Sequence, residues 1–361
     1  MKILCLIDTL GIGGAERQII GLVSLLNNRG FKTDLITYHQ HEFENELNTR
    51  YGIHSIILNA GNSKLSKLRA IRKFIKESGG YDWIIAYKDG PCIIGCLLKI
   101  LGGRFKLIVS ERSNTIVLNK AKRIKFFLYN WANYVVPNSL TEAENIKLRF
   151  PKLSHKIVPI TNFTDTDYFT PIQHQDKENR TILTTARLTK AKNIINYLKA
   201  IQVLKSRGFI HIHFDWYGNI QEGEEDYAHN CFKLREELNI EDLITFHPAK
   251  TNILPQYQEC DLFCLPSIYE GFPNVICEAM SCGKPILCSN VCDMPHIVKE
   301  SVNGILFDPT NVNEIADKLE KACQLTPKQI YEYGQQSRDT SVRLFSTDTF
   351  VNKYIQLLES I

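Results

Sequence analysis

Two glutamates eight residues apart, Glu270 and Glu278, have the residue type and spacing to border a binding site for a phosphorylated sugar. Glu270 lies just before a turn marked by Gly271 and Pro273, and Glu278 lies in the first turns of the helix that we predict after it. Helical side chains lean toward the amino terminus, so Glu278 would point toward the loop that carries Glu270. The free N–H groups and positive dipole end at that terminus favour an anion. An anion site bordered by two carboxylates that accept hydrogen bonds from hydroxyl groups would suit a nucleotide sugar.

A strand, a turn and a helix are needed to position these two carboxylates. The apolar run Asp261–Leu265 ends at Pro266, which indicates a buried strand. Val275–Cys282 has helical composition, and Gly283–Lys284–Pro285 is a stop signal. The alternative interpretation is that the two glutamates are ordinary solvated side chains beside a turn.

Apolar runs alternate with helical stretches along the whole chain, a pattern typical of parallel, doubly wound sheets. The length of 361 residues, with 44% hydrophobic and 23% charged residues, suffices for two domains. A polar segment from Phe163 to Arg180 separates two similar halves, and Val312–Ile361 is expected to be helical. We also expect helices at Ala15–Asn28 and Lys64–Glu77. The expected strands are Ile3–Ile7, Thr33–Thr37, Ser55–Leu58, Trp83–Ala86, Phe105–Val109, Tyr134–Val136, Lys156–Ile160, Thr181–Thr185, Ile210–Trp216, Leu243–His247, Leu262–Leu265, Ile286–Cys288 and Ile305–Phe307.

Two further constellations follow the first expected strand of each half. Gly11–Glu16 contains adjacent glycines, which let backbone N–H groups approach an anion, although strand–helix turns need glycine in any case. Arg187 and Lys192 follow the strand Thr181–Thr185 and could clamp a diphosphate. The alternative for this pair is a solvated basic turn, which is what we expect of the nearby Lys190.

The run P-S-x-x-E-G-F-P-x-x-x-x-E-A-M, together with G-G-A-E-R and R-x(4)-K, resembles the retaining GT-B glycosyltransferases of family four. The resemblance implies that Glu270 contacts the donor sugar and that Glu278 contacts the nucleotide ribose. It also implies that Arg187, Lys192 and Glu270 form the catalytic set, while the glycine-rich loop reaches the donor diphosphate and the acceptor. The substrate-binding residues that we expect from it are Gly13, Gly14, Glu111, Arg112, Gly218, Gly271, Phe272, Pro273, Asn274 and Glu278.

The same resemblance implies an α/β fold of the GT-B type, in which two Rossmann-like domains present parallel sheets to a cleft. Residues 1–165 would form an acceptor-binding domain, and residues 166–345 a domain that binds the nucleotide sugar. Residues 346–361 would form a helix that crosses back to the first domain. Asn162 lies in a segment that resembles the hinge between such domains.

The sequence departs from the family pattern at two places. Many relatives carry a histidine after the fifth strand of the first domain, where this chain has Ser110–Glu111–Arg112–Ser113, similar to the S-E-R-N variant of enzymes that build surface polysaccharides. Glu111 or Arg112 would replace the polar contact to the acceptor, or the two would form a structural ion pair. His296 stands where relatives have a glutamate, and it either changes sugar selection or lies on the surface at a helix start.

The resemblance also implies a mechanism with retention of anomeric configuration, in which positive groups stabilise the departing nucleoside diphosphate. Asp165–Thr166–Asp167 has the letters of a D-x-D metal motif but lies in the hinge segment. The 11 cysteines are scattered and form no C-x-x-C pair. We therefore expect no metal ion and no cofactor other than the nucleotide sugar as co-substrate.

The basic residues are distributed unevenly along the chain. Residues 1–160 hold 24 basic and 12 acidic residues, whereas the remainder holds 19 and 27. No nucleic-acid motif accompanies the basic half, so we expect it to contact an anionic membrane through Lys120–Trp131 and Lys64–Lys76. The alternative is that the aromatic residues of Lys120–Trp131 face the core and the lysines are merely solvated. No apolar run is long enough to span a membrane, which favours a cytoplasmic protein, peripheral on the inner face of the plasma membrane.

Three classes of function compete at this point. The first is a glycosyltransferase that moves a hexose or N-acetylhexosamine from a nucleotide sugar, by family habit UDP-linked, to a glycan or a polyprenyl-diphosphate-linked acceptor in surface polysaccharide synthesis. The second is a nucleotide-sugar epimerase of the same fold, which would need no acceptor. The third is an inactive module that binds sugar nucleotides without turnover. The combination of Arg187, Lys192, Glu270 and Glu278 favours the first.

Overall fold

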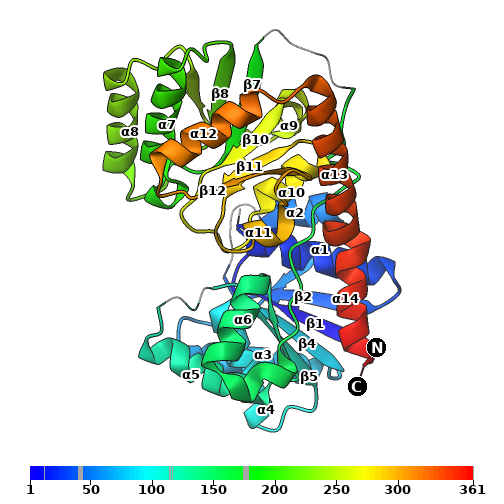
Figure 1. Cartoon of the computed structure of the whole chain (residues 1–361). Coiled ribbons are helices and arrows are strands. Elements are labelled where there is room, and N and C mark those ends of the chain that lie inside the picture. The colour runs from blue at the N-terminus through cyan, green and yellow to red at the C-terminus, as the bar shows by residue number, and fades with distance from the viewer. Residues whose placement is uncertain (12, 40–43, 114, 116, 174–178, 361) are drawn as a thin grey trace. The chain divides into compact units, whose positions relative to one another are not determined.

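The chain folds into two compact units, which Figure 1 shows as a cartoon. Unit 1 comprises Met1–Phe163 and Thr347–Ile361, and unit 2 comprises Thr164–Ser346. The structure is a computed structural model and describes residues 1–11, 13–39, 44–113, 115, 117–173 and 179–360. Ile12 of the glycine-rich stretch and residues 174–178 of the segment between the halves lie outside the described residues.

Unit 1 contains a parallel sheet of six strands in the order β3-β2-β1-β4-β5-β6. This is the order of a doubly wound dinucleotide-binding fold, in which ligands bind beyond the carboxyl ends of the strands. The strands are β1 (Lys2–Leu6), β2 (Lys32–Thr37), β3 (Ser55–Ile57), β4 (Trp83–Tyr87), β5 (Lys106–Glu111) and β6 (Tyr134–Pro137).

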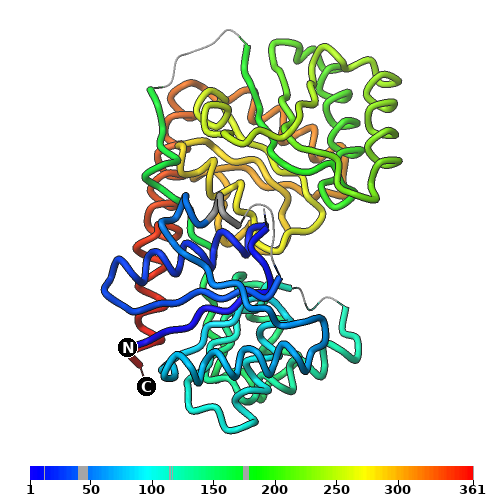
Figure 2. Tube along the Cα trace, turned by 180° about the vertical axis from the view of Figure 1, so that it is seen from behind, coloured from blue at the N-terminus to red at the C-terminus, as the bar shows by residue number. Residues whose placement is uncertain are grey.

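Helices cover both faces of the unit 1 sheet. On one face, apolar side chains of α3 (Lys64–Glu77), α4 (Asp89–Ile100), α5 (Lys120–Leu128) and α6 (Leu140–Arg149) pack on the strands. On the other face lie α1 (Gly14–Asn28) and the C-terminal helix α14 (Thr347–Glu359). Figure 2 shows this red C-terminal helix beside the blue N-terminal elements, so the two termini lie close together in unit 1. The remaining elements of unit 1 are α2 (Glu44–Tyr51), η1 (Tyr129–Trp131) and η2 (Pro151–Lys156).

Unit 2 repeats the plan with a second parallel sheet, in the order β12-β11-β10-β7-β8-β9. Its strands are β7 (Arg180–Thr185), β8 (Ile212–Tyr217), β9 (Ile244–His247), β10 (Leu262–Leu265), β11 (Ile286–Ser289) and β12 (Gly304–Phe307). One face packs on α7 (Ile194–Ser206), α8 (Glu225–Glu237) and α12 (Val312–Cys323). The other face packs on α9 (Leu254–Glu259), α10 (Asn274–Ser281), α11 (Met294–Ile297) and the end of α13 (Pro327–Phe345). A short helix, η3 (Lys190–Lys192), follows β7.

Local signals account for where several helices begin. Ser63 and Ser139 each accept a hydrogen bond from a backbone N–H in the first turn of α3 and α6. Thr326 forms a reciprocal capping box with Gln329 at the start of α13, and Pro327 occupies its first position. These helices are therefore specified by sequence at their amino ends.

The structure confirms the expected fold class of two Rossmann-like units with parallel sheets. Within the described residues, every expected strand is present near its expected position except Lys156–Ile160, where the prediction was wrong. That segment runs beside β6 and donates hydrogen bonds from Val158 and Ile160 to its carbonyl oxygens. Pro159 between them has no N–H to donate, so only the isolated bridge of Ile157 to Val135 forms.

The cysteines are structural side chains rather than a metal or disulfide framework in the described part of the chain. No disulfide joins any of the 11, all of which the structure describes, and all except Cys292 and Cys323 are buried. Burial raises the pKa of Cys264 to about 12, so this thiol stays protonated. Among the described residues, none of the helices combines the length and apolar character needed to cross a membrane.

Candidate functional site

Most of the expected site residues of unit 2 gather at the carboxyl ends of three neighbouring strands. Arg187 follows β7, Gly218 follows β8, and Glu270 follows β10. These strands are adjacent in the order β10-β7-β8, so the loops that leave them meet at one edge of the sheet. This edge is where doubly wound sheets bind their ligands.

Lys192 and Glu270 form an ion pair at this edge. The Glu270 carboxylate accepts a hydrogen bond from Lys192 Nζ and a second one, 2.6 Å long, from Ser267 Oγ. The two charged side chains are only 17% and 12% exposed, so solvent screens their interaction weakly. The backbone N–H of Ile268 also donates to the carbonyl oxygen of Ala191 at 2.9 Å. The structure thus joins the loop of the predicted diphosphate cations to the loop of the first glutamate.

Arg187 and Lys190 are exposed, but they differ in position. Arg187 is the second residue after β7 and makes no ion pair or side-chain hydrogen bond with any described residue, and its exposed side chain carries five N–H donors. Lys190 is exposed on the first position of η3, as expected for a solvated side chain. Arg187 is therefore available to an anionic ligand at the same edge as Lys192.

Glu278 is held by a buried tyrosine. The hydroxyl of Tyr257 donates to Glu278 Oε2 at 2.9 Å and lies 2.8 Å from Thr185 Oγ1 at the end of β7. Tyr257 is fully buried, and burial followed by the charge of Glu278 raises its pKa well above the ordinary value. Tyr257 therefore stays protonated and fixes the carboxylate of Glu278. Neither Tyr257 nor Ser267 was expected as a site residue, although Ser267 is visible in the motif three residues before Glu270.

The turn between the two glutamates contributes backbone rather than side chains. Gly271 is exposed, while the ring of Phe272 packs against Phe345 with 5.8 Å between ring centroids. Pro273 precedes Asn274, the first residue of α10, and its carbonyl oxygen accepts hydrogen bonds from backbone N–H groups in the first turn of that helix. This turn therefore offers a ligand mainly the main-chain groups of Gly271 and Phe272, and the expected N–H cradle stays a prediction.

Gly218 does more than form a turn. A Cβ at this position would overlap the carbonyl oxygen of Ala186, the residue before Arg187. The same carbonyl accepts a hydrogen bond of 2.8 Å from the indole of the fully buried Trp216. Only glycine allows the loop after β8 to pack this closely on the loop that carries Arg187.

We expect Gly218→Ala to lower the melting temperature of the protein and Gly271→Ala to leave it unchanged. The first substitution places a methyl group on the carbonyl of Ala186, an overpacking that costs about 1–3 kcal/mol. The second places it in open space, with no atom within 4 Å. Differential scanning calorimetry of the two variants tests the difference. Equal melting temperatures for both variants would show that Gly218 has no packing role.

Unit 1 has its own polar cluster at the carboxyl ends of β1 and β4. Lys88 Nζ lies 3.0 Å from Asp8 Oδ1 and 2.5 Å from Glu16 Oε1. Burial lowers the pKa of Lys88, but the two carboxylates outweigh this and raise it above the ordinary value. Lys88 has a φ of 70°, a strained conformation for a side chain that is not glycine. The exposed Gly13 and Gly14 lie next to this cluster, and a Cβ on Gly13 would overlap the carboxylate of Glu16.

Glu111 is not available to a substrate, and the expectation that it contacts the acceptor is wrong. Its side chain has no exposed surface and lies 2.7 Å from Nζ of Lys125 on α5. The hydroxyls of Tyr129 and Ser113 also donate to it, at 3.0 and 2.5 Å. The alternative of a Glu111–Arg112 pair is wrong as well, because the cation that neutralises Glu111 is Lys125.

Arg112, in contrast, points to the edge of the sheet with donors to spare. Its guanidinium stacks over the ring of Tyr87 at 4.2 Å and donates to Ser110 Oγ at 2.9 Å and to Asn162. Its buried Nη2 has no hydrogen-bond partner in the part of the chain that the structure describes. Asn162 is itself buried, so the segment expected to be a hinge is fixed to Arg112 here.

Two other expectations concern His296 and a metal. His296 is exposed on α11, which leaves both of its proposed roles open. The Asp165 carboxylate accepts the backbone N–H of Tyr168 at 3.0 Å and so forms a turn. No three side chains of the metal-binding types group together among the residues described.

Two family models match the chain, one for each half. The model described as Glycosyltransferase Family 4 matches residues 12–168, and the model described as Glycosyl transferases group 1 matches residues 167–337. Together they span most of the sequence, and both describe the same class of enzyme. The chain belongs to the glycosyltransferases. As a glycosyltransferase it presents Arg187, Lys192, Glu270 and Glu278 from the half matched by the group 1 model.

Two curated relatives align along nearly the whole glycosyltransferase. An "Uncharacterized glycosyltransferase" of Haemophilus influenzae is 27% identical over 354 residues, which cover 95% of this chain and 94% of the relative. The second is named GalNAc-alpha-(1->4)-GalNAc-alpha-(1->3)-diNAcBac-PP-undecaprenol alpha-1,4-N-acetyl-D-galactosaminyltransferase, from Campylobacter jejuni. It is 27% identical over 337 residues, which cover 89% of this chain and 88% of the relative.

Solved structures show the same fold. Anabaena HepE in complex with UDP has a TM-score of 0.87 at 20% identity and full coverage of both chains. A glycosyltransferase from Rickettsia africae has a TM-score of 0.85 at 19% identity, with coverage of 99% of this chain and 98% of that one. These similarities confirm the GT-B fold of the glycosyltransferase.

Proposed function

We propose that this glycosyltransferase moves a hexose or N-acetylhexosamine from a UDP-sugar to a growing glycan or a polyprenyl-diphosphate-linked sugar in surface polysaccharide synthesis, with retention of anomeric configuration. The observation that carries the proposal is the convergence of Lys192, Glu270 and the free Arg187 at one edge of the unit 2 sheet. UDP is present in the complex of the similar Anabaena structure, and the Campylobacter relative is named for an undecaprenol-linked acceptor.

Each residue of this edge has a role that follows from its charge and contacts. Arg187 and Lys192 stabilise the negative charge that develops on the departing diphosphate, and the N–H groups of Gly271 and Phe272 assist them. Glu270, oriented by Ser267 and Lys192, accepts hydrogen bonds from the donor sugar. Glu278, oriented by Tyr257, binds the ribose hydroxyls. The acceptor attacks the face from which the diphosphate leaves, and the departing phosphate takes its proton.

Arg112 is the acceptor contact that we propose in unit 1. Its Nη2 lacks a partner among the described residues, and its stacking on Tyr87 fixes the guanidinium plane. A guanidinium held in this way can donate hydrogen bonds to a phosphate or hydroxyl oxygen of the acceptor once its buried Nη2 becomes accessible.

An acceptor-dependent transfer assay tests the function. A thermal-shift screen of UDP-, GDP- and ADP-sugars first identifies the donor, and the hit is then incubated with and without polyprenyl-diphosphate-linked sugars. The proposal expects release of UDP that rises with acceptor and a product that keeps the anomeric configuration. Turnover of the sugar nucleotide without any acceptor would indicate an epimerase, and binding without turnover an inactive module.

We further propose that transfer requires no metal ion. The only D-x-D letters in the hinge segment belong to a turn in which Asp165 binds a backbone N–H. The expected result is that enzyme treated with EDTA keeps its initial rate with the identified donor. Loss of activity that Mn²⁺ restores would contradict this.

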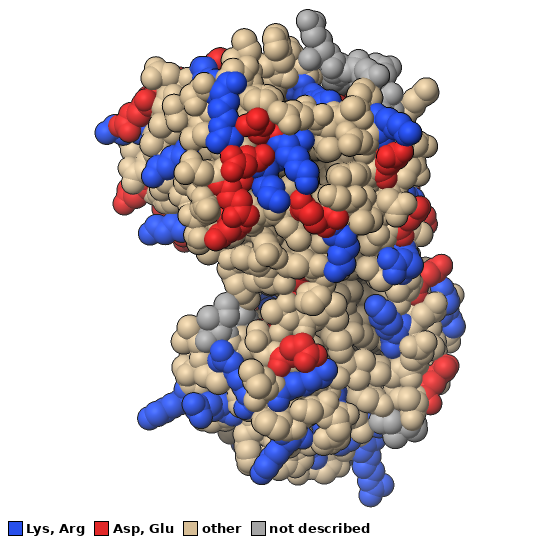
Figure 3. Space-filling view, viewed as in Figure 1, with Lys and Arg blue, Asp and Glu red and all other residues tan. Residues whose placement is uncertain are grey.

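An exposed surface of α5 and η1 is the part of unit 1 that we propose docks on an anionic membrane. This α5 patch consists of the apolar Ile124, Phe127 and Trp131 and the basic Lys120, Lys122 and Arg123, of which Lys122 is half-buried. Ile124 and Phe127 are 61% and 63% exposed, and the rings of Phe127 and Trp131 meet edge to face with centroids 5.4 Å apart. In Figure 3, blue side chains gather over the end of unit 1 that carries α5. The patch would place the enzyme on the inner face of the plasma membrane.

The protein surface that can contact a membrane is smaller than the sequence led us to expect. Lys125, Phe126 and Tyr129 are buried, so they cannot contact a lipid. On α3, the second expected basic surface, Lys73 is paired with Glu77 at 3.7 Å, and Lys67 lies over the ring of Tyr38. The α5 patch, with aromatic and basic side chains exposed together, therefore carries the proposal.

We expect the triple variant Lys120→Gln, Lys122→Gln, Arg123→Gln to lower partition onto phosphatidylglycerol vesicles by about 100-fold, because each cation near an anionic surface contributes about 1 kcal/mol. Cosedimentation with the vesicles measures this. The matched control removes three exposed lysines of unit 2, Lys199, Lys233 and Lys328, and should leave the partition unchanged. Equal losses in both variants would overturn the proposal.

A further inference from the structure

A large basic pocket lies at the amino-terminal ends of the unit 1 strands, opposite to their carboxyl ends. It has a volume of about 830 Å³ and lies where β1, β4 and β5 begin and where α3 and α4 end. Substrates of doubly wound sheets bind at the carboxyl ends of the strands, so this pocket is separate from that edge. Its volume is within the range of small-molecule sites.

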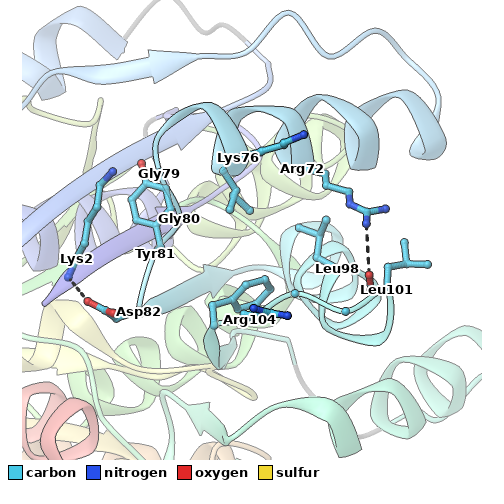
Figure 4. A pocket seen from close by; sticks show the side chains of 14 residues that line it. Lys2, Arg72, Lys76, Gly79, Gly80, Tyr81, Asp82, Leu98, Leu101 and Arg104 are labelled. Atoms are coloured by element: carbon cyan, nitrogen blue, oxygen red, sulfur yellow. Dashed lines mark hydrogen bonds between the residues drawn. The ribbon is translucent and has the colours of Figure 1, made fainter.

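Cations from three separate elements surround the pocket. Lys2 comes from β1, Arg72 and Lys76 from α3, and Arg104 from the loop between α4 and β5. Figure 4 shows Lys76 and Arg104 on opposite walls, with Arg72 bonded to the carbonyl of Leu101. Glycines at the ends of the two helices, such as Gly79 and Gly102, also line the pocket.

The charges of the pocket are poorly compensated. Its one lining carboxylate, Asp82, accepts the backbone N–H of Lys2 at 2.6 Å. Arg72 makes only a hydrogen bond of 3.5 Å, at the outer limit of such contacts. Lys76 and Arg104 are exposed and have no side-chain partner in the residues that the structure describes. Lys2 Nζ donates to the carbonyl oxygen of Ser78 at 2.5 Å and lies over the ring of Tyr81. The other three cations thus face one carboxylate.

A smaller cavity of about 570 Å³ extends the basic surface. It shares Asp82 and Arg104 with the first pocket and adds Lys99 and Lys106. Burial, followed by the charges of Lys106 and Lys156, lowers the pKa of Lys99, so these cations lie within one another's field. Cations near a helix C-terminus also stabilise its dipole, which accounts for Lys76 and Lys99 in the last turns of α3 and α4. That role does not explain Arg104 and Lys106, which lie outside the helices.

We propose that this pocket binds a phosphate-bearing ligand, with a diphosphate as the best match for three poorly compensated cations gathered around one cavity. Arg72 and Arg104 supply forked donors for phosphate oxygens, and Lys76 supplies a point charge between them. The phosphate group belongs either to a soluble molecule or to a lipid headgroup. The inference is independent of the proposed transfer reaction, because no residue of the pocket takes part in it.

Calorimetric titration with inorganic pyrophosphate tests the soluble source. The titration uses the whole chain with the substitutions Arg187→Gln and Lys192→Gln, which remove binding at the unit 2 edge. We expect binding that weakens with salt. Adding the pocket substitutions Arg72→Gln, Lys76→Gln and Arg104→Gln should lower the affinity for pyrophosphate at least about 100-fold, because hydrogen bonds to charged groups are the strongest of their kind. The matched control removes Lys64, Arg69 and Lys73, which are exposed on or at the start of α3 outside the pocket.

Vesicles of phosphatidylglycerol and phosphatidylcholine test the lipid source. These vesicle experiments use a chain that already carries Lys120→Gln, Lys122→Gln and Arg123→Gln, which remove the cations of the α5 patch. Any cosedimentation that remains should disappear when the pocket substitutions are added and persist when the control substitutions are added. Binding of pyrophosphate or of vesicles, abolished by the pocket variant and kept by the control, supports the proposal and identifies the source. Absence of both, or equal losses in pocket and control variants, overturns it. Circular dichroism melting confirms that each variant is folded.

Discussion

Replacing Lys192 by glutamine should lower the turnover number for sugar transfer by about 100-fold or more, the cost of removing one preorganised group that stabilises transition-state charge. Lys192 is only 17% exposed and touches the carboxylate of Glu270, so its charge is held in place and weakly screened. Its loss should affect the turnover number more than the Michaelis constant, because the diphosphate gains charge as the bond to the sugar breaks. Steady-state kinetics with the donor identified by thermal shift measures both constants.

Lys190 offers a matched control for this prediction. It has the same charge, lies two residues away in η3 and is exposed to solvent. Lys190→Gln should keep the rate of the unmodified enzyme, and Arg187→Gln should resemble Lys192→Gln. A similar rate in Lys190→Gln and Lys192→Gln would mean that the ion pair with Glu270 is structural only.

Replacing Lys125 by methionine should destabilise unit 1 by about 3–5 kcal/mol, the usual cost of leaving a buried charge without its partner. Lys125 is 2% exposed and neutralises Glu111, which has no exposed surface at all. It also pairs with Asp89 at 2.9 Å, so one amine joins α5, the end of β5 and the start of α4. Urea unfolding followed by tryptophan fluorescence measures the change.

A second substitution separates the charge from the packing. In the Lys125→Met background, Glu111→Gln removes the uncompensated charge and should recover part of the lost stability. Lys120→Met, at an exposed position of the same helix, should change little. Failure of Glu111→Gln to recover any stability would show that the buried pair is not the reason for the loss.

The pKa of Lys125 gives this contribution a direction with pH. Burial lowers the pKa, but Glu111 and then Asp89 outweigh burial and raise it above the ordinary value for lysine. A group whose pKa is raised on folding stabilises the fold fully below its unfolded pKa. The contribution of Lys125 should therefore be constant through neutral pH and decline only as the pH rises through its raised, folded-state pKa.

The fold could be predicted from the sequence because buried parallel strands are short apolar runs bounded by glycine and proline. β10 and α10 fall where the run before Pro266 and the stop at Gly283 indicate. The wrong strand at Lys156–Ile160 has a similar apolar composition, but Pro159 removes a donor that pairing would need. Apolar composition thus indicates where a strand could lie, while the hydrogen bonds that each residue can make decide whether the strand forms.

The candidate site could be predicted only in part. Motif spacing indicates Arg187, Lys192 and Glu270, because these side chains follow strands and so reach one edge. Tyr257 carries no such signal, since its contact with Glu278 depends on how α9 and α10 pack. The same limit explains why the burial of Lys125 could not be predicted, because a lysine is expected to be solvent-exposed from its residue type alone. In the folded chain it is buried, while its apolar neighbour Ile124 is exposed.

A crystal structure of the enzyme with UDP is the most direct test of the account. We expect the diphosphate to lie within about 3 Å of the Lys192 and Arg187 nitrogens, the reach of a hydrogen bond. We also expect the ribose hydroxyls to donate to Glu278. A nucleotide bound elsewhere on the chain, with Lys192 still paired only to Glu270, would contradict it.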